Sequence, residues 1–362
     1  MKTDPPRSIL VACPKWVGDV IMATPFLRDL QTSFPHAKIS LLMKKHFRKI
    51  LQHTPGIEAF YEWPSGYRET GALIRQLRKI SFDRGYLLTN SFSSALFFFL
   101  LKIKERIGYA RDGRRFLLTQ HLSPKKEQGR FLPVSMVDYY QDLLKLTAVP
   151  LGPREVRIYY SEAEREEATL FLKKIGIDPQ KPFVLLNPGA AFGSAKCWPP
   201  SYFAELGDRL VQELVCQILI LCGPDPHERQ LAQDIQKKMQ HLAVSTHENI
   251  ITLSLLKPVV AFSSLLITND SGPRHYATAL RVPSVTIFGS THQQWTDYDQ
   301  PEATRLQKEV PCGPCMQRIC PEVLNGRRHL CMELVTPEEV FQAAKHLFFS
   351  KKKPHEISLD SN

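Results

Sequence analysis

The sequence predicts an α/β protein of two domains, each built on a parallel sheet with crossover helices. Short apolar runs alternate with longer amphipathic segments in both halves of the chain, an order typical of parallel sheets. With 362 residues, of which 43% are hydrophobic, the chain is long enough for two separate cores. Three strand-to-helix junctions suited to phosphate binding are spread over the two halves. Together they indicate a ligand crevice between the domains.

The first domain is predicted to cover residues 1–160. Its expected strands are short apolar runs, namely Ile9–Cys13, Ile39–Met43, Glu58–Trp63, Gly85–Thr89 and Arg106–Tyr109. Its expected helices have amphipathic spacing, namely Asp19–Phe34, Gly71–Ile80, Ser93–Lys102 and Met136–Leu146. The most apolar segment, Ala95–Leu101, is far shorter than the roughly 20 residues that span a bilayer, so we expect a buried helix there.

The second domain is predicted to cover residues 161–349. Ser161, with Glu164 three residues later, has the pattern of a capping box that opens a helix. Thr336 and Glu339 repeat this pattern at the last helix. The expected strands are Phe183–Leu186, Gln217–Leu221, Leu265–Thr268 and Ser284–Phe288, and the expected helices are Tyr202–Leu214, Glu228–Met239 and Pro337–Phe349. Residues 350–362 are expected to form a basic tail.

At each of the three junctions an apolar strand runs into a turn that opens a helix. The turns are Trp16–Asp19, Asn187–Gly189 and Thr268–Gly272. Such turns expose backbone N–H groups at a helix N-terminus, where the partial positive charge suits a phosphate. None of them matches the P-loop or the G-x-G-x-x-G fingerprint. We therefore expect a nucleotide-linked substrate.

Three charged side chains near strand ends are candidates for chemistry, and each also has an ordinary structural interpretation. Asp19 is either a general base or a first-turn acid that the helix dipole stabilises. Lys196 either neutralises a diphosphate or is an exposed loop lysine. Glu228 either binds ribose hydroxyls or is a first-turn helix acid.

The segment Asp270–His275 brings a strand end, a glycine, a helix-compatible proline and a histidine to one helix start. An aspartate repels phosphate, so Asp270 either orders the loop or accepts a hydrogen bond from a sugar hydroxyl. Ser271 and Gly272 are then left to bind the phosphate. The alternative is an ordinary helix N-cap with His275 packed inside.

Four of the eight cysteines, Cys312, Cys315, Cys320 and Cys331, cluster in the sequence beside His329. Clustered soft donors are typical of a structural zinc site, although the second closely spaced pair of the familiar sites is missing. Three interpretations remain, namely a structural zinc ion, buried or free thiols, and a disulfide, which a reducing compartment disfavours.

The formal net charge of +11 favours an anionic partner, which includes nucleic acid, an anionic membrane surface and a phosphorylated substrate. Residues 102–130 hold nine Lys and Arg against three acids, and this stretch either faces an acidic acceptor or lipid headgroups, or is a solvated face. The N-terminus has no apolar region behind its charges, so we expect the protein to stay in the cytoplasm.

Three motifs resemble, in the same order, those of the bacterial ADP-heptose:lipopolysaccharide heptosyltransferases of glycosyltransferase family 9, most of all those that add the second heptose. They are Pro14–Asp19, Asn187–Pro199, and Thr268–Gly272 with His275. The similarity extends from about Ser8 to Phe349. The chain departs from the family pattern at Cys197, where a basic residue is common, and at Pro273 and Arg274, where an apolar pair is often found.

The resemblance implies a GT-B fold, in which two Rossmann-like domains face each other across a cleft, and an inverting transfer that needs no metal. It implies that Asp19 deprotonates the acceptor hydroxyl and that Lys196 stabilises the leaving diphosphate. Substrate contacts are implied for the remaining site residues, namely Gly18, Ser194, Glu228, Asp270, Ser271, Gly272 and His275.

The expected function is transfer of the second heptose from ADP-heptose to a lipid-linked inner-core acceptor, at the inner face of the cytoplasmic membrane. No cofactor is expected for catalysis. One alternative is another nucleotide sugar or acceptor on the same fold. Another is a nucleic-acid-binding protein without catalysis, but no recognised binding motif accompanies the basic stretch, so nucleic acid is not the expected partner.

Overall fold

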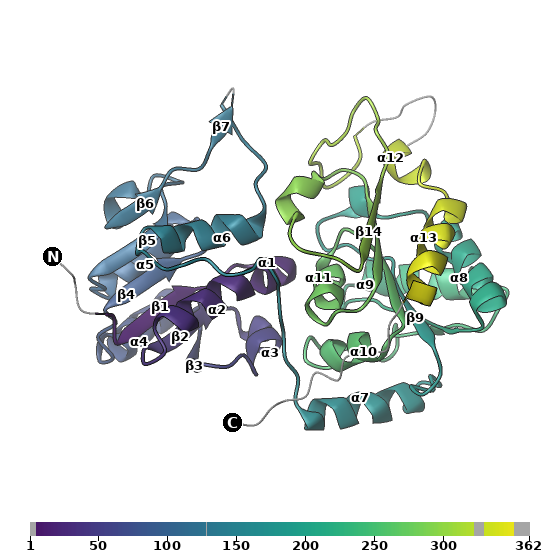
Figure 1. The fold of residues 1–362 in the computed structure, drawn as a ribbon, viewed down its shortest axis with the longest axis horizontal. Coiled ribbons are helices and arrows are strands. Elements are labelled where there is room, and N and C mark those ends of the chain that lie inside the picture. The colour runs from purple at the N-terminus through teal and green to yellow at the C-terminus, as the bar shows by residue number, and fades with distance from the viewer. Residues whose placement is uncertain (1–4, 128, 322–328, 351–362) are drawn as a thin grey trace. The chain divides into compact units, whose positions relative to one another are not determined.

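A computed structural model describes residues 5–127, 129–321 and 329–350 (Figure 1). The chain separates into two units, Met1–Glu162 with His292–Gln300 (unit 1) and Ala163–Thr291 with Pro301–Asn362 (unit 2). Each unit contains a six-stranded sheet in which every recorded strand pair is parallel, so the predicted pair of Rossmann-like domains is confirmed. Apart from Ser350, the predicted basic tail lies outside the described residues.

The sheet of unit 1 has the strand order β3-β2-β1-β4-β5-β6. Its strands are β1 (Ser8–Ala12), β2 (Lys38–Met43), β3 (Ile57–Glu62), β4 (Arg84–Leu87), β5 (Glu105–Tyr109) and β6 (Gln120–Leu122). Its helices are α1 (Val17–Met22), α2 (Thr24–Ser33), α3 (Arg48–Leu51), α4 (Tyr67–Arg78), α5 (Phe92–Leu100) and α6 (Met136–Lys145). Short elements complete the unit: η1 (Lys45–Phe47), η2 (Arg115–Leu117), η4 (Gln293–Thr296) and the antiparallel pair β7 (Lys126–Glu127) and β8 (Arg130–Phe131).

The single helix expected over residues 19–34 is two helices, because Pro25 lies in the first turn of α2. Proline has no N–H group and cannot bond to the carbonyl four residues earlier. The hydroxyl of Thr24 donates to that carbonyl, on Ile21, at 2.8 Å. The helix start that carries the first candidate site is therefore a separate six-residue helix.

The prediction of a buried helix at Ala95–Leu101 is wrong in part, because α5 is buried on one face only. Ala95, Phe97 and Phe98 do pack into the core with β1 and β4. Its opposite face is exposed, and that face carries Phe92, Leu96, Phe99 and Leu100. The helix is apolar on all sides, and hydrophobic periodicity alone could not reveal that one side is exposed in the described part of the chain.

The sheet of unit 2 has the order β11-β10-β9-β12-β13-β14. Its strands are β9 (Phe183–Asn187), β10 (Gln217–Ile220), β11 (Val244–Ser245), β12 (Leu265–Asn269), β13 (Ser284–Phe288) and β14 (Ala303–Gln307). Its helices are α7 (Glu162–Lys174), α8 (Pro200–Leu214), α9 (Pro226–Lys238), α10 (Leu256–Phe262), α11 (Gly272–Ala279), α12 (Leu330–Glu333) and α13 (Pro337–Ser350), with the single turn η3 (Ser194–Lys196).

Helices cover both faces of the unit 2 sheet, with α8 and α13 on one side and α10 and α11 on the other (Figure 1). The first face packs Trp198, Phe203 and Phe341 against alternate residues of β9, β12 and β13. The predicted capping box at the last helix is confirmed, since the Thr336 hydroxyl and the Glu339 carboxylate each bond to the other residue.

In both sheets the order in which strands are added reverses beside the first strand. The reversal lies between β1 and β4 in unit 1 and between β9 and β12 in unit 2. Open parallel sheets bind ligands beyond the carboxyl ends of the strands at this switch point. All three predicted junctions follow β1, β9 and β12, so they lie at the two switch points.

Among the described residues, no helix combines the length and apolar composition needed to cross a bilayer.

Candidate functional site

In unit 1 the candidate site is the first turn of α1, which carries Gly18 and Asp19 directly after β1. The Asp19 carboxylate accepts a hydrogen bond from the hydroxyl of Tyr140 on α6. Burial, and next the neighbouring Asp19, hold the pKa of Tyr140 well above its usual range. The tyrosine therefore remains a donor and orients the half-buried carboxylate, a partner that the sequence did not indicate.

In unit 2 two asparagines connect the junctions after β9 and β12. The side-chain amide of Asn187 donates to the hydroxyls of Thr268 and Ser271, each at 2.9 Å. Asn269 donates to the carbonyl of Pro188 at 2.6 Å. These bonds fix Ser271, the N-cap residue of α11, and Gly272, its first residue, beside the strand end of β9.

The predicted lysine and aspartate meet in a buried charged cluster, which we call the Asp270 cluster. The Nζ of Lys196 lies 2.5 Å from Oδ2 of Asp270, and Nη1 of Arg274 lies 2.9 Å from Oδ1 of the same carboxylate. The Thr291 hydroxyl donates to Oδ2 at 2.8 Å. Lys196 is only 9% exposed and Arg274 1% exposed, so the interpretation of Lys196 as an exposed loop lysine is wrong.

The cations of this cluster control its titration. Burial alone raises the pKa of Asp270, but the charges of Lys196 and Arg274 outweigh it and bring that pKa well below the usual range. His275 is also buried, and burial, followed by the charge of Arg274, lowers its pKa well below the ordinary value. The site thus holds an ionised aspartate, two cations and a neutral histidine at neutral pH.

The loop that carries Lys196 is held by the cysteine-rich segment. Gly193 has φ +150°, and a Cβ there would collide with the carbonyl oxygen of Arg318. The same carbonyl accepts a hydrogen bond from the backbone N–H of Ala195 at 3.0 Å. The ring of Phe192 lies 4.8 Å from the Lys196 Nζ and 5.5 Å from the guanidinium of Arg318. Ser194, the first residue of η3, is exposed.

Glu228 lies in the first turn of α9, and its carboxylate contacts two loop glycines. Its Oε2 accepts a hydrogen bond from the N–H of Gly223 at 2.9 Å. A Cβ on Gly189 would come 2.7 Å from its carboxyl carbon, so the Asn187–Gly189 turn passes directly over it. Burial raises the pKa of Glu228, and the bond from Gly223 opposes that effect.

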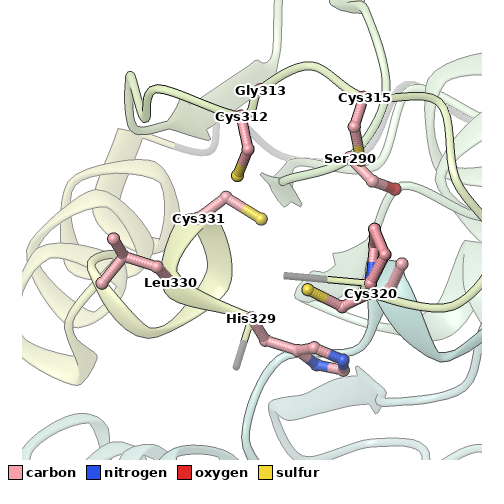
Figure 2. A pocket seen from close by; sticks show the side chains of 10 residues that line it. Ser290, Cys312, Gly313, Cys315, Cys320, His329, Leu330 and Cys331 are labelled. Atoms are coloured by element: carbon pink, nitrogen blue, oxygen red, sulfur yellow. The ribbon is translucent and has the colours of Figure 1, made fainter. Parts of the chain in front are cut away.

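The four clustered cysteines line one small pocket of about 20 Å³ together with His329 (Figure 2). Figure 2 shows the sulfur atoms of Cys312, Cys320 and Cys331 pointing into the same space. Burial, and next the neighbouring cysteines, raise the pKa of Cys331 to about 11. Within the described ranges, however, no three His, Cys, Asp or Glu side chains are arranged as ligands of a metal ion, so the predicted zinc site is not seen assembled.

A family model described as glycosyltransferase family 9 (heptosyltransferase) matches residues 70–324, which is well over half of the chain. The chain belongs to glycosyltransferase family 9. The resemblance seen in its motifs is therefore confirmed, and the hypothesis of a non-catalytic nucleic-acid-binding protein is wrong. The protein is a glycosyltransferase.

Individual relatives cover nearly the whole enzyme. It is 29% identical over 343 residues to lipooligosaccharide heptosyltransferase 2 of Campylobacter jejuni, across 94% of this chain and 98% of that protein. The solved structure of E. coli ADP-heptose lps heptosyltransferase II is similar with a TM-score of 0.77 and 24% identity, over 95% of this chain and 99% of the other. The structure of E. coli heptosyltransferase WaaC with ADP-2-deoxy-2-fluoro heptose is similar with a TM-score of 0.67 and 17% identity, over 94% and 99%. These likenesses confirm the GT-B fold class.

Within unit 2 the structure brings Lys196, Asp270 and His275 together at one switch point and places Glu228 under the neighbouring turn. Gly18 and Asp19 lie at the switch point of unit 1. Neither the burial of Arg274 nor the contact made by Thr291 was predicted from the sequence.

Proposed function

We propose that this family 9 enzyme transfers heptose from ADP-heptose to the inner core of lipopolysaccharide, where it adds the second heptose by an inverting displacement without a metal. The names of its relatives support the donor and the acceptor class. The Asp270 cluster supports the chemistry, because two buried cations face one carboxylate and leave a net positive charge at a ligand-binding switch point. A nucleotide diphosphate is the anion that such a site suits.

In the proposed reaction the acceptor hydroxyl oxygen attacks the anomeric carbon of the heptose while the bond from that carbon to the diphosphate breaks. Asp19 takes the hydroxyl proton as general base. Lys196 stabilises the negative charge that grows on the departing ADP. Glu228 holds the ribose, and donor contacts come from Ser194, Ser271, Gly272 and His275. Gly18 allows close approach of substrate beside Asp19.

For Asp270 we propose a more specific role than a sugar contact. Its two carboxylate oxygens already bond to Lys196, Arg274 and Thr291. Asp270 therefore positions Lys196, and Arg274 balances the carboxylate when Lys196 turns to the diphosphate. In this scheme Arg274 is a positioning residue. Family members with the usual apolar pair at this place have no charged side chain to do the same.

The donor is tested by calorimetry with purified enzyme and a panel of nucleotide sugars. Tighter binding of ADP-heptose than of ADP or UDP-sugars supports the proposal. Preference for another nucleotide sugar supports the alternative donor, which the departures from the family pattern at Cys197 and Arg274 favour. The acceptor is tested with inner-core acceptors that carry no heptose or one heptose. Transfer only to the former contradicts addition of the second heptose.

Lys196→Ala is expected to lower kcat/KM for transfer about 100-fold and to weaken ADP-heptose binding. Loss of one hydrogen-bond donor to the charge that develops in the transition state typically has an effect of this size. Steady-state kinetics and calorimetry measure the two quantities. Thr291→Val is the matched control, since it removes one bond to Asp270 and leaves both cations in place. Kinetics unchanged by Lys196→Ala would exclude the lysine from the reaction.

The membrane completes the proposal, because an inner-core acceptor is lipid-linked. We place the enzyme at the inner face of the cytoplasmic membrane, in peripheral contact with it. Its formal charge of +11 favours attraction to acidic lipids and acidic core sugars.

We also propose that the pocket cysteines bind a structural zinc ion that takes no part in the transfer. The support is that Cys312, Cys315, Cys320 and Cys331 line one pocket. Side-chain rotations would have to complete the ligand geometry, since the described structure does not contain it.

Cys315→Ser is expected to lower the melting temperature by about 5 °C or more while activity per folded molecule changes less, because structural zinc contributes to folding. Metal analysis of protein purified without chelator should find close to one zinc per chain. Cys222→Ser, outside the pocket and bonded to Thr246, is the control. Metal-free protein of unaltered stability would leave the cysteines as plain thiols.

A further inference from the structure

Helix α5 of unit 1 presents an apolar face to solvent. Phe92, Leu96, Phe99 and Leu100 are 36% to 48% exposed and recur at the spacing of one helix face. Phe116 of η2, which is 73% exposed, extends this face, and its ring lies 6.0 Å from that of Phe92. We call these five residues the α5 face. Contiguous exposed apolar residues of this kind mark an interaction site in a folded protein.

Cations border the α5 face. The guanidinium of Arg106 lies 5.4 Å from the ring centroid of Phe99, and Arg78 donates two hydrogen bonds to the carbonyl of Leu100. Exposed Lys102 lies two residues after the end of the helix, and exposed Arg115 precedes Phe116.

Nearby acids do not offset these cations. Between residues 75 and 116 the sequence has three acids. Glu105 pairs with Arg84 at 2.5 Å, and Asp83 accepts bonds from the backbone N–H groups of Arg7 and Ser8. Of these three acids only Asp112 is fully exposed, so the exposed side chains of this stretch that border the α5 face carry a net positive charge.

We infer that the α5 face is the surface by which the enzyme docks on an anionic lipid bilayer. Aromatic and leucine side chains enter the boundary between headgroups and acyl chains, and the bordering Lys and Arg bind lipid phosphates. A soluble protein partner would not require a cationic border around an apolar centre, whereas an anionic membrane matches both parts. The inference deepens the proposed function, on which it rests for the purpose of the contact.

The test measures sedimentation of the full-length enzyme with vesicles, without donor or acceptor. Wild-type protein is expected to bind vesicles of phosphatidylethanolamine with phosphatidylglycerol more tightly than vesicles of phosphatidylcholine, and to lose binding as salt rises. Phe92→Ser with Phe99→Ser should weaken binding at least tenfold, because each removes a phenyl group from apolar contact. Lys102→Gln with Arg115→Gln should weaken binding to the anionic vesicles alone, by about fivefold per charge.

Phe349→Ser is the matched control, since Phe349 is 68% exposed on α13 of unit 2 and the chemical change is the same. It should bind vesicles as the wild type does. Phe116→Ser, outside the helix, provides a second variant if the double substitution in α5 lowers the melting temperature. The inference would be overturned if the wild-type protein does not bind anionic vesicles, or if variants of the α5 face bind them as tightly as the wild type.

Two further measurements distinguish lipid docking from self-association of the chain and from failure of the proposed transfer. Sedimentation velocity without lipid shows whether the α5 face instead joins two copies of the chain, and a dimer that the α5 variants dissociate would overturn lipid docking. Transfer to a delipidated water-soluble acceptor should be equal in wild type and α5 variants. If no transfer occurs with any variant while vesicle binding behaves as stated, the proposed function fails and the docking surface stands.

Discussion

We expect Asp19→Ala to slow transfer about 100- to 10,000-fold and to leave ADP-heptose binding nearly intact. A general base contributes about this much to a rate. The proposed donor-binding groups lie in unit 2, whereas Asp19 belongs to α1 of unit 1. The measurements are turnover with saturating acceptor and calorimetric titration of the donor.

Asp19→Asn makes this test sharper, because the amide keeps the size of the side chain and still accepts the bond from Tyr140 but cannot take a proton. It should lose as much activity as Asp19→Ala. Asp142→Asn, a partly buried acid of the same unit that pairs with Lys145, is the control and should remain active. Near-normal turnover in either Asp19 variant would mean that another group accepts the proton.

We expect Asp270→Asn to lower the free energy of unfolding by about 3–5 kcal/mol, because it leaves Lys196 and Arg274 buried without their counter-charge. For a cooperative unit of the size of unit 2 we expect the melting temperature to fall by about 10 °C. Chemical unfolding at neutral pH measures the loss. Asp234→Asn, on the surface of α9, makes the same chemical change and should cost little.

The effect depends on pH in a defined direction. The pKa of Asp270 is lowered in the folded enzyme, so its ionised form stabilises the fold above the unfolded pKa of about 3.9. The advantage of the wild type over Asp270→Asn should therefore be complete at neutral pH and shrink as the pH falls below about 4. An advantage that is equal at pH 7 and in strong acid would contradict an ionised Asp270.

The sequence predicted the central strands because they are short, apolar and buried on both faces, as β1, β9 and β12 show. It missed the edge strands β6, β11 and β14. β11 has two residues, and all five residues of β14 are only partly buried, so neither has a distinct hydrophobic pattern. The division of one long helix at Pro25 was also missed, since the hydrophobic spacing continues across it.

Motifs identified Asp19, Lys196 and Asp270, but not how they are held. Lys196 and Asp270 are 74 residues apart, and nothing local indicates that they pair. Arg274 looks like a surface cation at a helix start, yet its charge is buried against Asp270. A basic residue where an apolar one is usual was the one available signal, because a buried charge requires a partner.

The hydrogen bond from the N–H of Ala195 to the carbonyl of Arg318 joins the loop that carries Lys196 to the segment that contains Cys315 and Cys320. Coupling of this kind is reciprocal: whatever ordering one segment imposes on the other is returned with the same free energy. If a bound donor orders the lysine loop, we expect it to change the exposure of the thiols, and modification of the thiols should change the affinity for the donor by the same coupling free energy. Alkylation of the cysteines with and without donor would test this coupling without any assay of sugar transfer.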